Sequence, residues 1–105
     1  PSYAPAYRGI GDIYYRVGKF EKAKENYQKY LEIAESNTTT LTRYAYILFM
    51  AKDYSEATTI INQISAIDST NIILKRLLGY SYFEQNKNKE GLANMQYFFK
   101  KIDPA

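Results

Sequence analysis

The chain of 105 residues contains no cysteine and no histidine. The absence of cysteine excludes a disulfide framework and thiolate metal sites. The absence of histidine excludes catalytic groups of the Ser-His-Asp and Cys-His kinds, and metal centres built on imidazole. The sequence has no phosphate-binding loop and no dinucleotide fingerprint, and its carboxylates are scattered over expected solvent faces. We therefore expect neither catalysis, nor a metal site, nor a cofactor.

Proline, glycine and long apolar runs are also scarce. Only 3 Pro and 5 Gly occur, which leaves room for long helices. No run approaches the roughly 18 apolar residues of a membrane span, and no basic segment followed by an apolar one marks a leader. These features predict one mostly helical domain of modest core, without membrane insertion in this segment. They do not indicate a cellular compartment.

What the sequence does contain is a repeat of 34 residues. Small residues recur at two places in each unit, first as Gly11, Ala45 and Gly79 and then as Ala23, Ala57 and Gly91. Large residues follow them at intervals of three, four and seven positions, which are helical spacings. Each unit therefore holds two helices, which touch at the small residues. We expect Ala23 and Ala57 to be almost inaccessible to solvent.

Turn and cap residues divide this repeat into six expected helices. Gly18, Lys52-Asp53 and Asn86-Lys87-Asn88 mark turns inside the units, and short polar residues mark those between them. Asn37-Thr38-Thr39 also matches a glycosylation sequon, but we favour a helix cap there. The helices are expected at 4–17, 20–34, 38–51, 54–67, 71–84 and 87–101.

The pattern of the first unit is similar to a known family. The run Tyr7-x-x-Ile10-Gly11-x-x-Tyr14, followed by Gly18-x-Phe20, Ala23 and Tyr27, resembles the tetratricopeptide repeat. The resemblance extends over units 4–37, 38–71 and 72–105. It is weakest in the third unit, where Lys75 and Asn88 replace apolar residues. The resemblance implies an all-α fold, a tetratricopeptide-like α-solenoid of three helix-turn-helix hairpins forming a single domain over residues 1–105.

The two ends of the chain resemble repeat boundaries. Pro1 occupies the place of the family's repeat-ending proline, and Asp103-Pro104 looks like the same signal one residue displaced. We therefore expect a fragment of a longer repeat array. In that case the last helix lacks its neighbour and leaves Phe98, Phe99 or Ile102 partly exposed, which favours weak self-association through a terminal helix.

The resemblance also implies a function, because in this family the first helix of each unit lines a concave groove that binds another polypeptide. Aromatic side chains there would contact apolar ligand groups, and arginines would bind acidic ones. Asp12 and Glu84 would pair with neighbouring arginines or select a basic ligand residue. The alternative is an architectural segment whose groove is filled by the parent protein. The implied groove residues are Arg8, Asp12, Tyr15, Arg16, Thr42, Arg43, Tyr46, Phe49, Met50, Arg76, Tyr80, Phe83 and Glu84, with Pro5, Thr39 and Ile73 beside them.

One ligand type known from the family is not expected here. Its carboxylate clamp uses Lys, Asn and Arg side chains, and Arg8 can stand for the first of these. Asp12 and Arg43, however, replace the two Asn residues, and Ile73 and Leu77 stand where further cations belong. A clamp for a terminal carboxylate is therefore not predicted.

The net charge of +3 raises the question of nucleic-acid binding. Residues 72–105 carry six Lys or Arg against three Asp or Glu, whereas the other two units are almost balanced. These cations are divided between helix ends and turns and do not form one stripe, which is typical of a solvated surface. Nucleic acid is therefore not an expected partner.

Overall fold

The computed structural model describes residues 3–102, which form an all-helical chain. Each helix begins and ends within two residues of the positions expected from the sequence. Pro1 and Asp103-Pro104, which we read as repeat boundaries, lie outside the described residues. The helices are α1 (Ala4–Arg16), α2 (Phe20–Ile33), α3 (Thr38–Met50), α4 (Tyr54–Ile67), α5 (Ile73–Glu84) and α6 (Asn88–Ile102).

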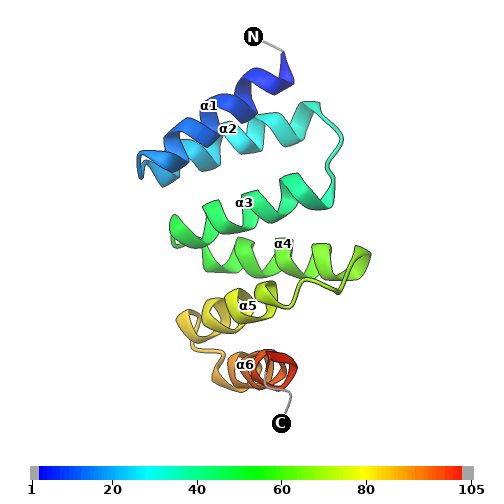
Figure 1. The fold of residues 1–105 in the computed structure, drawn as a ribbon. Coiled ribbons are helices and arrows are strands. Elements are labelled where there is room, and N and C mark those ends of the chain that lie inside the picture. Colours follow the sequence, from blue (N-terminus) through cyan, green and yellow to red (C-terminus); the bar gives the residue numbers. More distant parts are fainter. Residues whose placement is uncertain (1–2, 103–105) are drawn as a thin grey trace.

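The helices pair as hairpins α1–α2, α3–α4 and α5–α6, which stack in chain order (Figure 1). The first and last helices, α1 and α6, lie at opposite ends of the stack, whose extents are 50 × 25 × 20 Å. A helix in such a stack buries its apolar face mainly against its nearest neighbours. Within residues 3–102, every helix is too short or too polar to cross a bilayer.

Small residues set the closest approach of the two helices in each hairpin. A methyl group at Gly11 would lie 2.6 Å from the Tyr27 ring, and one at Gly79 would lie 3.2 Å from the carbonyl oxygen of Gly91. Ala23 and Ala57 are both 0 % exposed, as expected from the sequence. The small residues therefore lie at the helix contacts, where a larger side chain has no room.

The turn inside each hairpin uses the same backbone conformation three times. Gly18, Lys52 and Asn86 have φ angles of 81°, 63° and 62°, and they are 34 residues apart. This left-handed conformation ends the first helix of each unit and disfavours most side chains other than Gly and Asn. The repeat is thus a repeat of backbone geometry even where Lys52 replaces the favoured residue.

Asn37 caps α3, as predicted. Its side-chain oxygen accepts the backbone N–H of Thr40 at 3.0 Å, and the Thr40 hydroxyl oxygen accepts the Asn37 N–H at 3.2 Å. This reciprocal arrangement is a capping box. Asp53 starts α4 in a similar way and accepts the Glu56 N–H at 3.4 Å.

Aromatic stacking joins the first hairpin to the second. The rings of Tyr27 in α2 and Tyr44 in α3 are nearly parallel, with centroids 6.3 Å apart. Both side chains are buried, and they belong to one core that continues through Leu48 and Ile61 to Leu78 in α5. Most tyrosines of the repeat pattern are therefore packing residues, which leaves few for other contacts.

Candidate functional site

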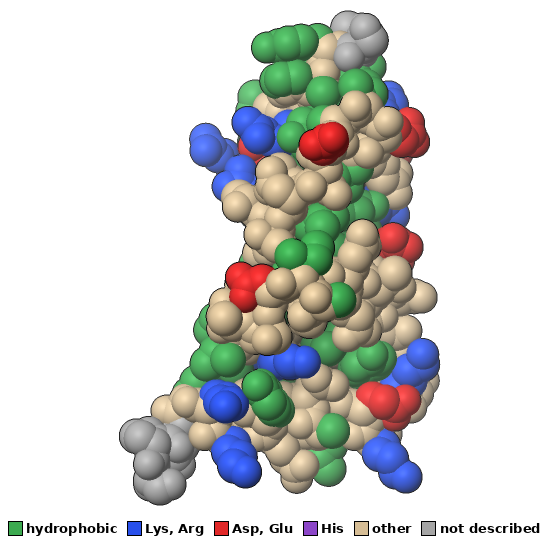
Figure 2. Space-filling model, turned by 90° about the vertical axis from the view of Figure 1, so that its right-hand side faces the viewer, with side chains coloured by type: hydrophobic (Ala, Val, Ile, Leu, Met, Phe, Trp, Pro, Cys, Tyr) green, Lys and Arg blue, Asp and Glu red, His purple; other side chains and the backbone are tan. Residues whose placement is uncertain are grey.

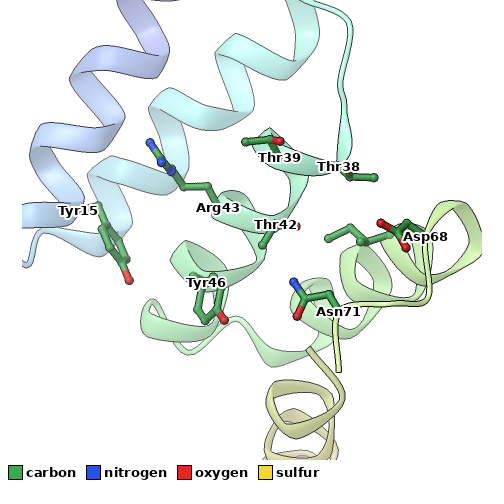
Figure 3. A pocket seen from close by; sticks show the side chains of 9 residues that line it. Tyr15, Thr38, Thr39, Thr42, Arg43, Tyr46, Asp68 and Asn71 are labelled. Atoms are coloured by element: carbon green, nitrogen blue, oxygen red, sulfur yellow. The ribbon is translucent and has the colours of Figure 1, made fainter. Parts of the chain in front are cut away.

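Two adjacent cavities lie along α1, α3 and α5, and we call them together the groove. The first has a volume of about 510 Å³. In Figure 3, Tyr15 and Arg43 lie on one side of it and Asp68 and Asn71 on the other, with Thr42 between them. This cavity has mixed polarity and charges of both signs at its edges. Its lining residues are Tyr15, Thr38, Thr39, Thr42, Arg43, Tyr46, Ile64, Asp68 and Asn71.

The second cavity is more apolar and lies between α3 and α5. Its volume is about 470 Å³, and Arg76 is the charged residue among those that line it. Tyr46 lines both cavities, so the groove continues from one into the other. Cavities of this size hold a few side chains of a peptide. The residues lining the second are Tyr46, Phe49, Ile73, Arg76, Leu77 and Tyr80.

Asp12 joins three helices at the first end of the groove. One of its carboxylate oxygens accepts the Tyr27 hydroxyl at 2.5 Å, and the other accepts Arg43 Nη1 at 3.1 Å. These bonds connect α1 to α2 inside the first hairpin and to α3 in the second. The expectation that Asp12 pairs with a neighbouring arginine is therefore met by Arg43. The Arg43 side chain keeps about half of its surface in solvent.

The same contacts change how two groups titrate. Burial, followed by the hydrogen bond to Asp12, raises the pKa of the Tyr27 hydroxyl well above its ordinary value of 10.0. The hydrogen bond that Arg43 donates to Asp12 also raises the pKa of Arg43, which stays charged. The positive charge of Arg43 is thus already engaged by a carboxylate of the chain itself, so an acidic ligand group would compete with Asp12 for it.

We expect the Tyr27→Phe variant to lose less unfolding free energy than the parent when the solution is made alkaline. Because the folded-state pKa of Tyr27 is raised, its contribution is complete below pH 10.0 and is lost as the pH rises above that value, where the unfolded tyrosine ionises. Urea unfolding at neutral pH and at about pH 11 measures this loss. At neutral pH the variant should be destabilised by about 1.5–3 kcal/mol through the lost hydrogen bond to the charged carboxylate.

Tyr44→Phe serves as the comparison, because burial also raises the pKa of Tyr44. Each variant should remove part of the alkaline loss, and the double variant should remove more than either. An alkaline loss that is the same in Tyr27→Phe as in the parent would show that Tyr27 ionises freely in the folded chain.

Two further arginines of the expected groove set, Arg76 and Arg8, lie on aromatic rings. The Arg76 guanidinium carbon lies 5.8 Å from the centre of the Tyr80 ring, and that of Arg8 lies 5.7 Å from the Tyr30 ring. Such contacts orient the cation and leave its N–H groups available. Within residues 3–102, Arg76 has no carboxylate partner at salt-bridge distance. Unlike Arg43, Arg76 thus lines a cavity of the groove without a carboxylate partner among the described residues.

The structure brings together most, but not all, of the residues that the sequence placed in the groove. Arg8, Asp12 and Arg16 line two smaller cavities next to Arg43. Phe83 instead packs its ring against Gly91 of α6. Met50 and Glu84 are exposed, and neither lines the two cavities of the groove. Those that do line them are Tyr15, Thr42, Arg43, Tyr46, Phe49, Arg76 and Tyr80.

Phe49 and Tyr46 have a structural role besides their place in the groove. Both are partly buried and pack against the core, and Phe49 meets Tyr54 edge to face at 5.5 Å. Truncation of either side chain therefore removes packing as well as groove surface. Tyr80, which is 42 % exposed, is a cleaner probe of the groove.

Sequence reasoning missed the side of the first cavity formed by Ile64, Asp68 and Asn71. The pattern treated Asp68 and Asn71 only as turn residues. Asp68 accepts both the backbone N–H of Thr70, at 3.0 Å, and its hydroxyl, at 2.7 Å. These bonds lower the pKa of Asp68, so it remains an anion at the groove edge. No signal in the repeat indicated that this turn reaches the groove.

The comparisons with known proteins agree on the fold. The tetratricopeptide repeat model matches residues 4–37. The Arabidopsis OM64 TPR domain superposes with a TM-score of 0.75 at 17% identity, covering 90% of this chain and 78% of that one. The first TPR of Spaghetti (RPAP3), bound to HSP90 peptide SRMEEVD, gives 0.75 at 21% identity, with 92% and 77% covered. No curated protein sequence matches the chain.

A longer bacterial structure is also similar. MamA from Desulfovibrio magneticus RS-1 gives a TM-score of 0.83 at 18% identity, and the match covers 94% of this chain and 56% of that one. At such identities the likeness concerns the fold, and the match at residues 4–37 supplies the family signal. Together with the six described helices, these findings show that the described residues have the fold of a tetratricopeptide repeat α-solenoid, and that the first unit carries the sequence signature of the repeat.

Proposed function

We propose that this chain is a protein-interaction module that binds a peptide segment of another polypeptide in the groove, without catalysis of its own. The observation that carries the proposal is the continuity of the groove: Tyr46 lines both cavities, and α1, α3 and α5 all contribute to them. An extended or helical peptide is long enough to contact both cavities and all three helices at once. A small ligand would need only one of the two cavities.

The chemistry of the groove favours a particular kind of segment. The second cavity offers Tyr46, Phe49 and Tyr80 to a large apolar side chain. Arg76 at its edge favours an acidic group nearby. The first cavity places Arg43 opposite Asp68, which favours uncharged polar groups or one charge of each sign. The preferred ligand is thus a peptide with an apolar anchor beside an acidic residue.

Similar structures support peptide binding as the general role. Two of them, the first and second TPR of Spaghetti (RPAP3), are described as bound to the HSP90 peptide SRMEEVD. The present chain differs where the family's carboxylate clamp would be, because Arg43 there already forms an ion pair with Asp12 of the same chain. We therefore do not propose a terminal-carboxylate ligand. The aromatic cavity is the expected main anchor.

Tyr80→Ala is expected to weaken peptide capture. Peptides selected from a random phage-displayed library on the immobilised chain supply the ligands, and fluorescence anisotropy measures their affinity. Loss of the Tyr80 ring removes a wall of the second cavity and the support of Arg76, so the affinity should fall about fivefold or more, which is about 1 kcal/mol. The melting temperature should change little.

Tyr97→Ala is the matched control. Tyr97 is 43 % exposed and, like Tyr80, has a cation on its ring, but it lies on α6 away from the groove. It should leave the affinity unchanged. Equal effects of the two substitutions would place binding elsewhere. Failure of the library to yield any groove-dependent peptide would favour the architectural role, in which the groove is filled by the parent protein.

A further inference from the structure

The two end helices carry exposed apolar side chains that the groove does not use. On α1 these are Ile10, Ile13 and Val17, between 42 % and 62 % exposed, and on α6 they are Leu92 and Phe99, at 52 % and 55 %. We call the two sets the head stripe and the tail stripe. Figure 2 shows hydrophobic side chains gathered at the upper end of the molecule, where α1 lies in Figure 1. Of the three α6 residues named as candidates for exposure, Phe99 and Ile102 are exposed, whereas Phe98 is buried.

The repeat shows what the head stripe is suited to contact. Ile13 occupies the position of Ile47 in the second unit, which is 0 % exposed. Ile10 likewise corresponds to Tyr44 and Leu78, and both of these are buried. Tyr44 is covered by Tyr27 of the preceding hairpin. The head stripe is therefore the uncovered equivalent of a junction that is buried at α3 and α5.

The tail stripe occupies repeat positions that are covered in α2 and α4, the helices that pack against a following hairpin. Leu92 corresponds to Thr58 of α4, which is buried, and Phe99 corresponds to Leu31 of α2, which packs against the core. α1 packs chiefly against α2, and α6 chiefly against α5. Each stripe is thus one half of a unit junction, and one copy of the chain carries both halves.

We propose that α6 of one copy stacks on α1 of a second copy, so that the 34-residue repeat continues from chain to chain. The contact uses different faces on the two partners and is therefore heterologous. Such a contact does not close after two copies. Association should accordingly produce a series of lengths that grows with concentration.

Residue pairs at the junctions inside the chain indicate which side chains would meet in the proposed contact between α6 and α1. In the repeat, the stacked pair Tyr27 and Tyr44 corresponds to Met95 of one copy and Ile10 of the next. These two side chains are again an apolar pair. At the α4–α5 junction, Asn62 donates its amide N–H to the Tyr82 hydroxyl at 3.3 Å.

The equivalents of Asn62 and Tyr82 across the proposed contact are Gln96 of one copy and Tyr14 of the next. An amide and a phenol can form the same kind of hydrogen bond. One apolar contact and one hydrogen-bonding pair of the internal junctions therefore have chemically similar equivalents across the proposed contact.

Charge does not oppose this arrangement. The two ion pairs between the first and second units, Lys24 with Asp53 and Arg43 with Asp12, are replaced across the proposed contact by pairs that contain at most one charged residue. The corresponding pairs are Leu92 with Lys19 and Tyr80 with Gly9. No two like charges face each other at these places. Because the contact is apolar, added salt should not weaken it.

Sedimentation equilibrium from micromolar to millimolar concentration tests the proposal. The average mass of the parent should rise above the 12.2 kDa of one chain and past twice that value. Ile13→Lys and Phe99→Lys should each hold the chain as a monomer, since every contact needs one intact head stripe and one intact tail stripe. Ile67→Lys is the control, because Ile67 is 67 % exposed on α4, away from both ends. It should associate like the parent.

Mixing the two end variants distinguishes head-to-tail stacking from other contacts. The Ile13→Lys chain keeps its tail stripe and the Phe99→Lys chain keeps its head stripe, so an equimolar mixture should reach dimers and stop there. Circular dichroism should show unchanged helix content in both variants, because both positions are exposed.

Three results would overturn the proposal. The first is a parent that remains monomeric at millimolar concentration, which would leave the stripes to other segments or partners. The second is association that Phe99→Lys abolishes and Ile13→Lys does not, which would indicate a symmetric α6–α6 contact. The third is a mixture of the two variants that remains monomeric.

Discussion

Ile47→Ala is expected to lower the free energy of unfolding by about 2–5 kcal/mol. Ile47 is 0 % exposed on α3, at the position where the second hairpin meets the first. The substitution removes buried methylene and methyl groups and leaves a cavity between units that neighbours can fill only in part. The higher helix propensity of alanine offsets only a few tenths of a kcal/mol. Urea denaturation followed by circular dichroism measures the change.

The repeat supplies its own control for this prediction. Ile13→Ala changes the same residue type at the same repeat position, but Ile13 is 61 % exposed on α1. At micromolar concentration, where the head stripe has no partner, the unfolding free energy should stay within about 0.5 kcal/mol of the parent. Similar losses for the two variants would mean that α1 is covered in solution or that the junction at α3 is loosely packed.

Ala57→Leu is expected to destabilise the chain by about 1–3 kcal/mol through overpacking. Ala57 is 0 % exposed and, in the repeat, occupies the place that Gly91 has opposite Gly79. The added carbons have no space unless α3 and α4 move apart or side chains leave their preferred rotamers. The melting temperature should fall by about 4 °C or more for each kcal/mol lost.

Ala66→Leu is the control for the overpacking experiment, because Ala66 lies on the same helix with its side chain exposed. Leucine and alanine differ little in helix propensity, so this variant should melt close to the parent. A melt of Ala57→Leu that matches the parent would show that the register of small residues does not set the spacing of the hairpins.

The helices and their contacts could be predicted from the sequence because the repeat records them locally. Small residues such as Ala23 and Ala57 recur at helical spacing, and caps such as Asn37 lie next to the helices that they start. These signals depend on neighbours within one or two turns of the chain. Their repetition in three units also gave the order of the hairpins.

The groove was predictable in part, because the repeat places Tyr46 and Tyr80 on the face beside the core stripe. Its charges were not. Whether Arg43 is free or bound depends on Asp12, which lies 31 residues earlier and approaches it only when two hairpins stack. The second wall of the first cavity, with Asp68 and Asn71, likewise comes from a turn whose direction no local pattern records.

The sequence by itself determined the secondary structure, the small-residue contacts and the family resemblance, since each of these follows from local spacing repeated every 34 residues. Only the tertiary structure decided which side chains are used up by packing and which remain available. Ile13 and Ile47 illustrate the reason: they have the same type and the same place in the repeat, yet one is exposed and the other buried. Burial depends on which helix stacks against a face, and the residues of the unit itself do not contain that information.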